Sequence, residues 1–155
     1  AALSGMEIDN ALIQLDGPEI PIMDGSAAAF VEAINQVGIV EQDADKDYFV
    51  VTENLTYEDT ERHTEMLLVP QDEFRLTVMV DYNSPFLGTQ HAHMYHTGQF
   101  ESEISKCRTF VFLRELEILA KNGLIKGGDL DNAIVLVDTP LPQEKLDEIA
   151  DHFIE

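Results

Sequence analysis

Residues 108–137 read RTFVFLRELEILAKNGLIKGGDLDNAIVLV, and this stretch carries the clearest structural signals in the chain. Phe112–Lys121 places its apolar side chains at helical spacing, and Asn122-Gly123 is a typical helix end. Apolar residues directly before this segment, and again at Ala133–Val137, favour short strands. The stretch therefore predicts a strand–helix–strand unit in a protein of mixed α and β structure.

The remaining chain shows weaker but readable signals. Ser26 is a favourable N-cap for a helix over Ala27–Val37 that Gly38 would end, and the acidic residues 41–47 are the best candidate for a linker. Strands are expected at Asn10–Leu15, Tyr48–Thr56, Thr64–Val69 and Phe74–Asp81. A short helix is expected at Phe100–Lys106 and a last helix from Pro142. Ala1–Gly5 is expected to be the end of a helix, with Gly5 in the left-handed conformation. Residues 83–97 contain turn formers and no clear period.

Composition narrows the classes of function. The chain has 155 residues, of which 45% are hydrophobic, and a net charge of -21, which disfavours binding to nucleic acid or to anionic membranes. No apolar run approaches the roughly 18–20 residues that a membrane span needs. A single cysteine, Cys107, excludes an internal disulfide and a thiolate-rich metal site. These features predict a soluble protein of a reducing compartment, the cytoplasm.

Cations are concentrated in one part of this acidic chain. Five of the nine lie between residues 106 and 126, so an anionic ligand would be favoured there. The alternative is ion pairing along one helix, with Glu117 near Arg114 and Lys121. The five are Lys106, Arg108, Arg114, Lys121 and Lys126.

Three groups of residues could carry chemistry. His91, His93 and His96 could share a metal if they lie on a strand and its turn, or they could be surface loop histidines. Cys107 is either a nucleophile or a small buried residue. Thr109, next to a guanidinium and an aromatic ring, could donate a hydrogen bond to an oxyanion or cap a helix.

Three motifs resemble those of one enzyme family. They are EIPIMDGSAA at 19–28, ISKCRTFVF at 104–112 and GLIKGGDLDNAIV at 123–135, and their order also fits. They are similar to motifs of the UDP-3-O-acyl-N-acetylglucosamine deacetylases, the zinc amidases of lipid A synthesis. The long acidic segment 139–155 resembles the Bacteroides-like branch, in which the deacetylase is fused to a hydroxyacyl-carrier-protein dehydratase.

The resemblance implies an α+β fold in which two similar domains pack as a two-layer sandwich. Residues 1–42 would be the end of the first βαα domain, and residues 43–155 most of the second. A β-α-β insert at about 110–137 would form the passage for the acyl chain of the substrate. Self-association through an uncovered face of the second domain is expected.

The resemblance also implies roles for individual residues. Thr109 would be the catalytic residue that stabilises the oxyanion, and the acylated UDP-sugar would be the substrate. Contacts with this substrate would come from Phe110, Leu113, Leu116, Gly128, Asp81 and Tyr82, where Tyr82 replaces the phenylalanine of the family.

The zinc ligands and the general base of the family have no counterpart in this chain. They would precede Ala1 or follow Glu155, so no zinc is expected to bind the segment alone, which would be inactive by itself. The rival hypothesis is a non-catalytic acidic interaction domain, with metal binding through His91, His93 and His96.

Overall fold

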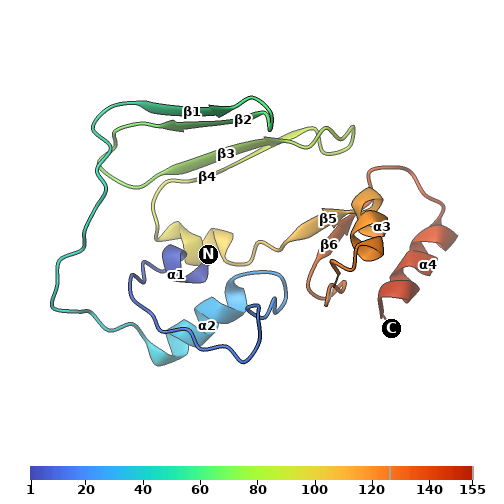
Figure 1. Cartoon of the computed structure of the whole chain (residues 1–155), viewed down its shortest axis with the longest axis horizontal. Helices are drawn as coiled ribbons and strands as arrows, with labels where there is room; N and C mark the ends of the chain where they lie inside the picture. Colours follow the sequence, from blue (N-terminus) through green and yellow to red (C-terminus); the bar gives the residue numbers. More distant parts are fainter. Residues whose placement is uncertain (126, 155) are drawn as a thin grey trace.

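The computed structural model of the chain describes residues 1–125 and 127–154. Along the chain, two helices come first, two pairs of strands follow, and helices alternate with short strands in the last third (Figure 1). Their order is α1 (Ala2–Gly5), α2 (Ala28–Val37), β1 (Leu55–Asp59), β2 (Thr64–Leu68), β3 (Leu76–Asp81), β4 (Thr89–Met94), the π-helix η1 (Phe100–Ile104), β5 (Phe110–Phe112), α3 (Leu113–Lys121), β6 (Ile134–Leu136) and α4 (Gln143–Ile154).

The six strands form three separate two-stranded sheets. β1 and β2 pair antiparallel, as do β3 and β4, whereas β5 and β6 pair parallel. In Figure 1 the two hairpins run along the top of the molecule, and the β5–β6 pair lies with α3 and α4 on the right-hand side. The fold is therefore of mixed α and β structure, and the two-layer sandwich with its domain limits stays a prediction.

The strand–helix–strand unit expected from the sequence is confirmed. α3 makes the crossover that a parallel strand pair requires, and Phe112 and Leu116 are buried within this unit. Gly123 ends the helix with φ of +64°, and the N–H of Leu124 donates to the carbonyl of Leu119 at 3.0 Å. The sequence was sufficient to predict the elements of this unit because helical spacing, the helix end at Gly123 and the short apolar segments each depend on residues a few positions apart.

α2 forms within one residue of the predicted range, but its N-cap is Ala27, which makes no side-chain cap hydrogen bond, so the prediction of Ser26 as the N-cap was wrong. Ser26 Oγ accepts a hydrogen bond from the Ala28 N–H at 3.1 Å, and Gly38 follows the helix with φ of +77°. The buried face of α2 presents Val31 to Met94 at the end of β4 and Phe100 in η1, and these three residues form the central core cluster. This core joins the start of the chain to the segment that precedes Thr109.

Two strand predictions were wrong in whole or in part, and one strand was not predicted. Residues 10–15 and 48–54 have no strand partner among the described residues, whereas Thr89–Met94 is a strand that pairs with β3. A strand forms only where a neighbouring strand satisfies the N–H and C=O groups of its backbone. A local sequence pattern does not show which two segments will pair. The usable signal at β4 was the alternation of polar His91 and His93 with Ala92 and Met94.

Gly5 was expected to be left-handed, and this was wrong. Gly5 lies within α1, and the left-handed residue is Glu7, with φ of +58°. A Cβ built on Gly5 would lie 2.2 Å from Phe100 Cδ1. The glycine is therefore required by close contact with an aromatic ring rather than by its backbone angle.

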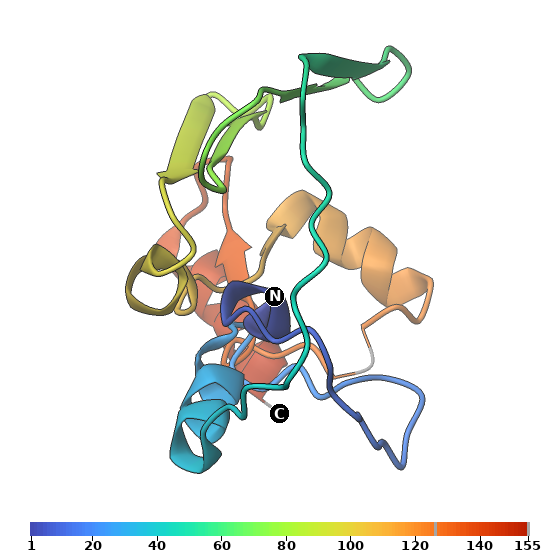
Figure 2. The same ribbon diagram turned by 90° about the vertical axis from the view of Figure 1, so that its left-hand side faces the viewer.

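The molecule is open. Its accessible surface is 12,995 Å², whereas a compact protein of 17.4 kDa exposes about 7,900 Å². Large apolar side chains such as Phe49, Tyr57 and Leu67 are exposed, and Figure 2 shows the β1–β2 hairpin standing away from the helices. Within the described residues, no helix is both long enough and apolar enough to cross a membrane.

Candidate functional site

Three segments that lie far apart in the sequence meet at Thr109. The Thr109 N–H donates to the Gly25 carbonyl at 2.8 Å, and the Thr109 carbonyl accepts from the Ile134 N–H at 3.0 Å. Nearby, the Ala27 N–H donates to the carbonyl of Ser105 at 2.9 Å. Thr109 therefore leads into β5 with its backbone fixed on both sides, and its side chain is exposed. The helix-cap hypothesis for Thr109 is wrong, because a strand follows it.

Arg108 spans the same junction with its side chain. Its Nε donates to the Asp24 carbonyl at 2.7 Å, and its Nη2 donates to the Leu130 carbonyl at 3.0 Å. These two carbonyls belong to the loops on either side of Thr109. The guanidinium thus links both loops to the start of β5.

The loops approach each other closely at Gly25. This residue has φ of +81°, and a Cβ built on it would lie 1.9 Å from the Asn132 carbonyl oxygen and 3.3 Å from Thr109 Cγ2. Asn132 in turn organises its own loop, because its side chain donates to the Gly127 carbonyl and accepts from the Asp129 N–H. Only glycine fits at position 25 of this junction.

Asp24 carries the main electrostatic shift of the site. Its Oδ1 accepts hydrogen bonds from Ser26 Oγ at 2.8 Å and from the Ser26 N–H at 3.1 Å. The Ser26 hydroxyl and the Ser26 N–H lower the pKa of Asp24 below its ordinary value of 3.8, and the charge of Arg108 acts in the same direction. The carboxylate is thereby held ionised as part of the loop that receives Arg108.

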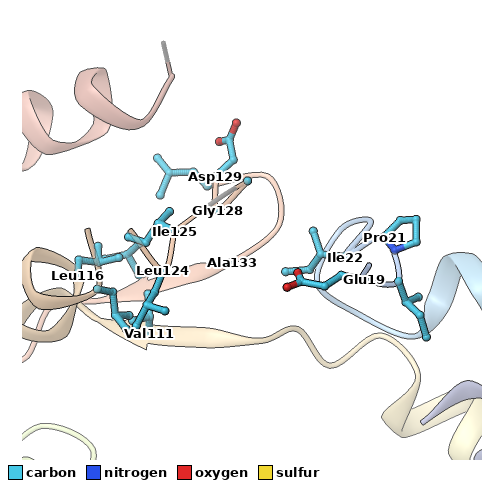
Figure 3. A pocket seen from close by; sticks show the side chains of 15 residues that line it. Glu19, Pro21, Ile22, Val111, Leu116, Leu124, Ile125, Gly128, Asp129 and Ala133 are labelled. Carbon is cyan, nitrogen blue, oxygen red and sulfur yellow. The ribbon is translucent and has the colours of Figure 1, made fainter. Parts of the chain in front are cut away.

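An open cavity of about 530 Å³ lies between this loop and the β-α-β unit. Figure 3 shows Pro21 and Ile22 on one wall and Val111, Leu116 and Leu124 on the other, with Glu19 and Asp129 adding carboxylates. The volume and the apolar walls are those of a typical small-molecule or lipid-chain site. Its lining comprises residues 19–22, Val111, Leu116, Leu119, Leu124, Ile125, 127–130, Ala133 and Val135.

The expected substrate-contacting residues fall into two places. Leu116 and Gly128 line the cavity. Phe110 and Tyr82 lie instead in an aromatic cluster, and Leu113 is half-buried at the start of α3. Asp81 is exposed at the end of β3, where its Oδ1 accepts from the Asn83 N–H at 2.9 Å. Tyr82, which contacts Phe110, therefore lies on the opposite face of β5 from Val111 and the cavity.

The aromatic cluster ties the end of β3 to the β-α-β unit. Tyr82 meets Phe110 and Phe112 edge to face, with ring centroids 5.6 and 6.2 Å apart. The Arg114 guanidinium lies 4.2 Å from the Phe112 centroid and forms an ion pair with the nearly buried Asp138. Since Arg108 and Arg114 are both used in internal contacts, the positive stretch in the sequence is largely structural at these two positions.

The histidines and the cysteine that the sequence suggested as metal ligands or nucleophile do not line the cavity. His91 and His93 are exposed on β4, and His93 stacks against Tyr95 at 4.5 Å. Among the side chains that the structure describes, no group of three or more His, Cys, Asp or Glu residues is arranged to hold a metal ion. Cys107 is exposed, so its interpretation as a small buried residue was wrong.

Sequence reasoning missed the roles of Arg108 and Asn132. Arg108 was noted as one cation among five, and Asn132 as part of a motif, although both are polar residues that flank apolar strands. A long polar side chain next to a short buried strand often satisfies backbone carbonyls of neighbouring loops. That signal indicates a structural hydrogen bond, but it does not say which loops are joined.

Comparison with known sequences identifies the class of protein. Residues 1–154 match the family described as LpxC, UDP-3-O-acyl N-acetylglycosamine deacetylase, and the chain belongs to this family. The family predicted from the three motifs is therefore confirmed.

Particular relatives refine this placement. The chain is 47% identical over 152 residues to the bifunctional enzyme LpxC/FabZ of Chlorobaculum tepidum and 44% identical over 151 residues to that of Porphyromonas gingivalis, each alignment covering 97% of this chain. It is 46% identical over 137 residues to the UDP-3-O-acyl-N-acetylglucosamine deacetylase of Bdellovibrio bacteriovorus, which covers 88% of this chain. The chain spans 32%, 33% and 45% of the length of these three relatives.

Proposed function

We propose that this chain supplies the oxyanion-stabilising threonine and the acyl-chain passage of a UDP-3-O-acyl-N-acetylglucosamine deacetylase, acting in the cytoplasm. Thr109 would donate its hydroxyl hydrogen to the oxyanion that forms when the N-acetyl carbonyl is attacked. The cavity beside β5 would receive the acyl chain. The family match and the names of the relatives support the substrate class.

One observation carries the proposal. Thr109 and Val111 are two residues apart on extended chain, so their side chains point to the same face, and Val111 lines the cavity. Thr109 is not itself a lining residue of the cavity, but on this geometry its hydroxyl would lie beside the apolar passage, as an acylated amide substrate requires. A donor whose backbone is already fixed stabilises developing charge with little reorganisation.

The remaining predicted contacts complete the assignment. Leu116 and Gly128 would contact the acyl chain, and Leu113 would support it from the start of α3. Asp81 and Tyr82 would lie close to the nucleotide, and Phe110 would line the passage. The fused dehydratase implied by the Bacteroides-like resemblance is part of the same proposal, since two relatives are bifunctional.

The family resemblance implies a zinc ion, which would activate water and polarise the carbonyl when bound. The described residues offer no ligand group that fits it, so the proposal routes no step through zinc in this chain. The rival hypothesis is an acidic interaction domain, and only its metal-binding form, through His91, His93 and His96, would require such a group. The family match favours the deacetylase.

Thr109→Ala and Thr109→Ser, made in the complete gene product that contains this chain, test the proposal by acetate release from the acylated UDP-sugar. Loss of one oxyanion donor should lower kcat by about 10²–10³-fold with little change in KM, whereas serine should retain most of the activity. Thr77→Ala, at an exposed position on β3, is the matched control. An unchanged kcat for Thr109→Ala would contradict the proposal.

A further inference from the structure

Thr109 is exposed, so packing around its side chain cannot by itself fix where its hydroxyl lies. Its position depends on the backbone at the start of β5. That backbone is held by one hydrogen bond to Gly25, in the loop before α2, and by one from Ile134, the first residue of β6, which directly follows the loop at Leu130 and Asn132. Whatever fixes these two loops relative to each other therefore fixes Thr109.

We propose that Arg108 is a positioning residue for Thr109. Its guanidinium joins the loop at Asp24 and the loop at Leu130, which flank Thr109 on either side. This inference rests on the function proposed for Thr109. It assigns to Arg108 no contact with the substrate.

The geometry requires an arginine. The two acceptors are the backbone carbonyls of Asp24, 2.7 Å from Nε, and Leu130, 3.0 Å from Nη2. The planar guanidinium therefore donates two hydrogen bonds that point to different loops. Hydrogen bonds from a charged donor are roughly twice as strong as neutral ones. A lysine ammonium at the same position is a point charge on a flexible chain and cannot reproduce this planar fork.

The junction also tolerates little displacement. The Asn132 carbonyl occupies the space where a side chain on Gly25 would begin, so the two loops are in contact at this point. Asn132 binds its own loop through Gly127 and Asp129, which makes that loop a unit that moves together. Without Arg108, no side chain would join the Asp24 and Leu130 carbonyls, and the junction would depend on backbone hydrogen bonds alone: those of Thr109, that from Ala27 to Ser105, and the β5–β6 pairing.

Arg108→Lys in the complete gene product, combined with Thr109→Ala, tests the inference by a double-mutant cycle. Misplacement of a catalytic group by about 1 Å costs about 10²-fold, so Arg108→Lys should lower kcat by roughly this factor and leave KM nearly unchanged. In the Thr109→Ala background the same substitution should have no further effect, because the group it positions is gone. Arg62→Lys, at an exposed arginine in the turn after β1, is the control.

Two outcomes separate this inference from the proposed function. If Thr109→Ala lowers kcat but Arg108→Lys lowers it equally in both backgrounds, Arg108 does not act through Thr109, and the inference is overturned while the function stands. If Thr109→Ala leaves kcat unchanged, the proposed function fails first.

Amide hydrogen exchange on this chain gives a readout that needs no activity. In Arg108→Lys, the N–H groups of Thr109 and Ile134 should exchange faster, whereas the N–H of Val31 in the separate core should keep its protection. Unchanged protection at Thr109 and Ile134 would overturn the inference. A loss of protection at Val31 as well would show general unfolding and would also count against a local positioning role.

Discussion

Asp24 and Ser26 show how single residues prepare the site. Ser26 donates two hydrogen bonds to the Asp24 carboxylate and accepts one from the Ala28 N–H, so it links the loop to the start of α2. The Asp24 carbonyl then accepts from Arg108. The hydrogen bonds to its carboxylate thus hold Asp24 in the conformation in which its backbone carbonyl faces Arg108.

Ser26→Ala should change how stability depends on acid. Because the pKa of folded Asp24 lies below 3.8, the carboxylate contributes stability above that value, which is lost as pH falls through the folded pKa. Without Ser26 the pKa of Asp24 should rise toward 3.8 and the acid loss should become shallower. The Ala28 N–H should also lose its acceptor, the Ser26 hydroxyl, which should cost about 1 kcal/mol at neutral pH.

An NMR titration of the Asp24 carboxyl carbon, together with urea unfolding at several pH values, measures both effects. Ser102→Ala, at an exposed serine of η1, is the matched control and should move neither. A titration of Asp24 that is the same with and without Ser26 would contradict the assigned cause.

At the scale of elements, the β-α-β unit depends on one face of α3. Leu116 is buried and lines the cavity, whereas Ile118 on the same helix is 61% exposed. Phe112 closes the unit from β5, and the ion pair of Arg114 with Asp138 joins α3 to the segment after β6. α3 therefore has one face packed against the β-α-β unit and one face exposed to solvent.

Leu116→Ala should destabilise the unit by about 2–4 kcal/mol, because it removes buried methyl groups and enlarges the cavity. Ile118→Ala should change stability by less than about 0.5 kcal/mol, since its side chain is already exposed. Urea unfolding with matched circular dichroism measures both variants. Equal losses for the two variants would show that the buried face of α3 has been misassigned.

At the scale of the whole molecule, exposed apolar surface and charge oppose each other. The chain exposes apolar side chains on its hairpins, yet a net charge of -21 makes two copies repel. Salt weakens the repulsion much more than it weakens apolar contact. Ionic strength should therefore decide whether copies of the chain associate.

Sedimentation velocity should show monomers at about 0.01 M salt and larger species at about 1 M salt, where the screening length falls to about 3 Å. Leu67→Lys on β2 should reduce this association, because Leu67 is 61% exposed and apolar. Thr60→Lys adds the same charge in the neighbouring turn and should reduce it less. A chain that stays monomeric throughout would show that its exposed surface does not associate.

The sequence by itself determined the elements whose causes are local. The apolar stripe of α3, its end at Gly123, the end of α2 at Gly38, and the family motifs all depend on residues a few positions apart. Such signals are complete in the sequence because helix periodicity and capping act within one or two turns.

The tertiary structure alone decided which distant residues meet. The pairing of β4 with β3, the contact of Gly25 with Asn132, and the bridge made by Arg108 depend on segments up to about a hundred residues apart. Each needs the packing of several elements at once, and the local pattern specifies only that a polar or small residue stands there. The sequence therefore indicated Thr109 as a candidate, and the fold decided what holds it in place.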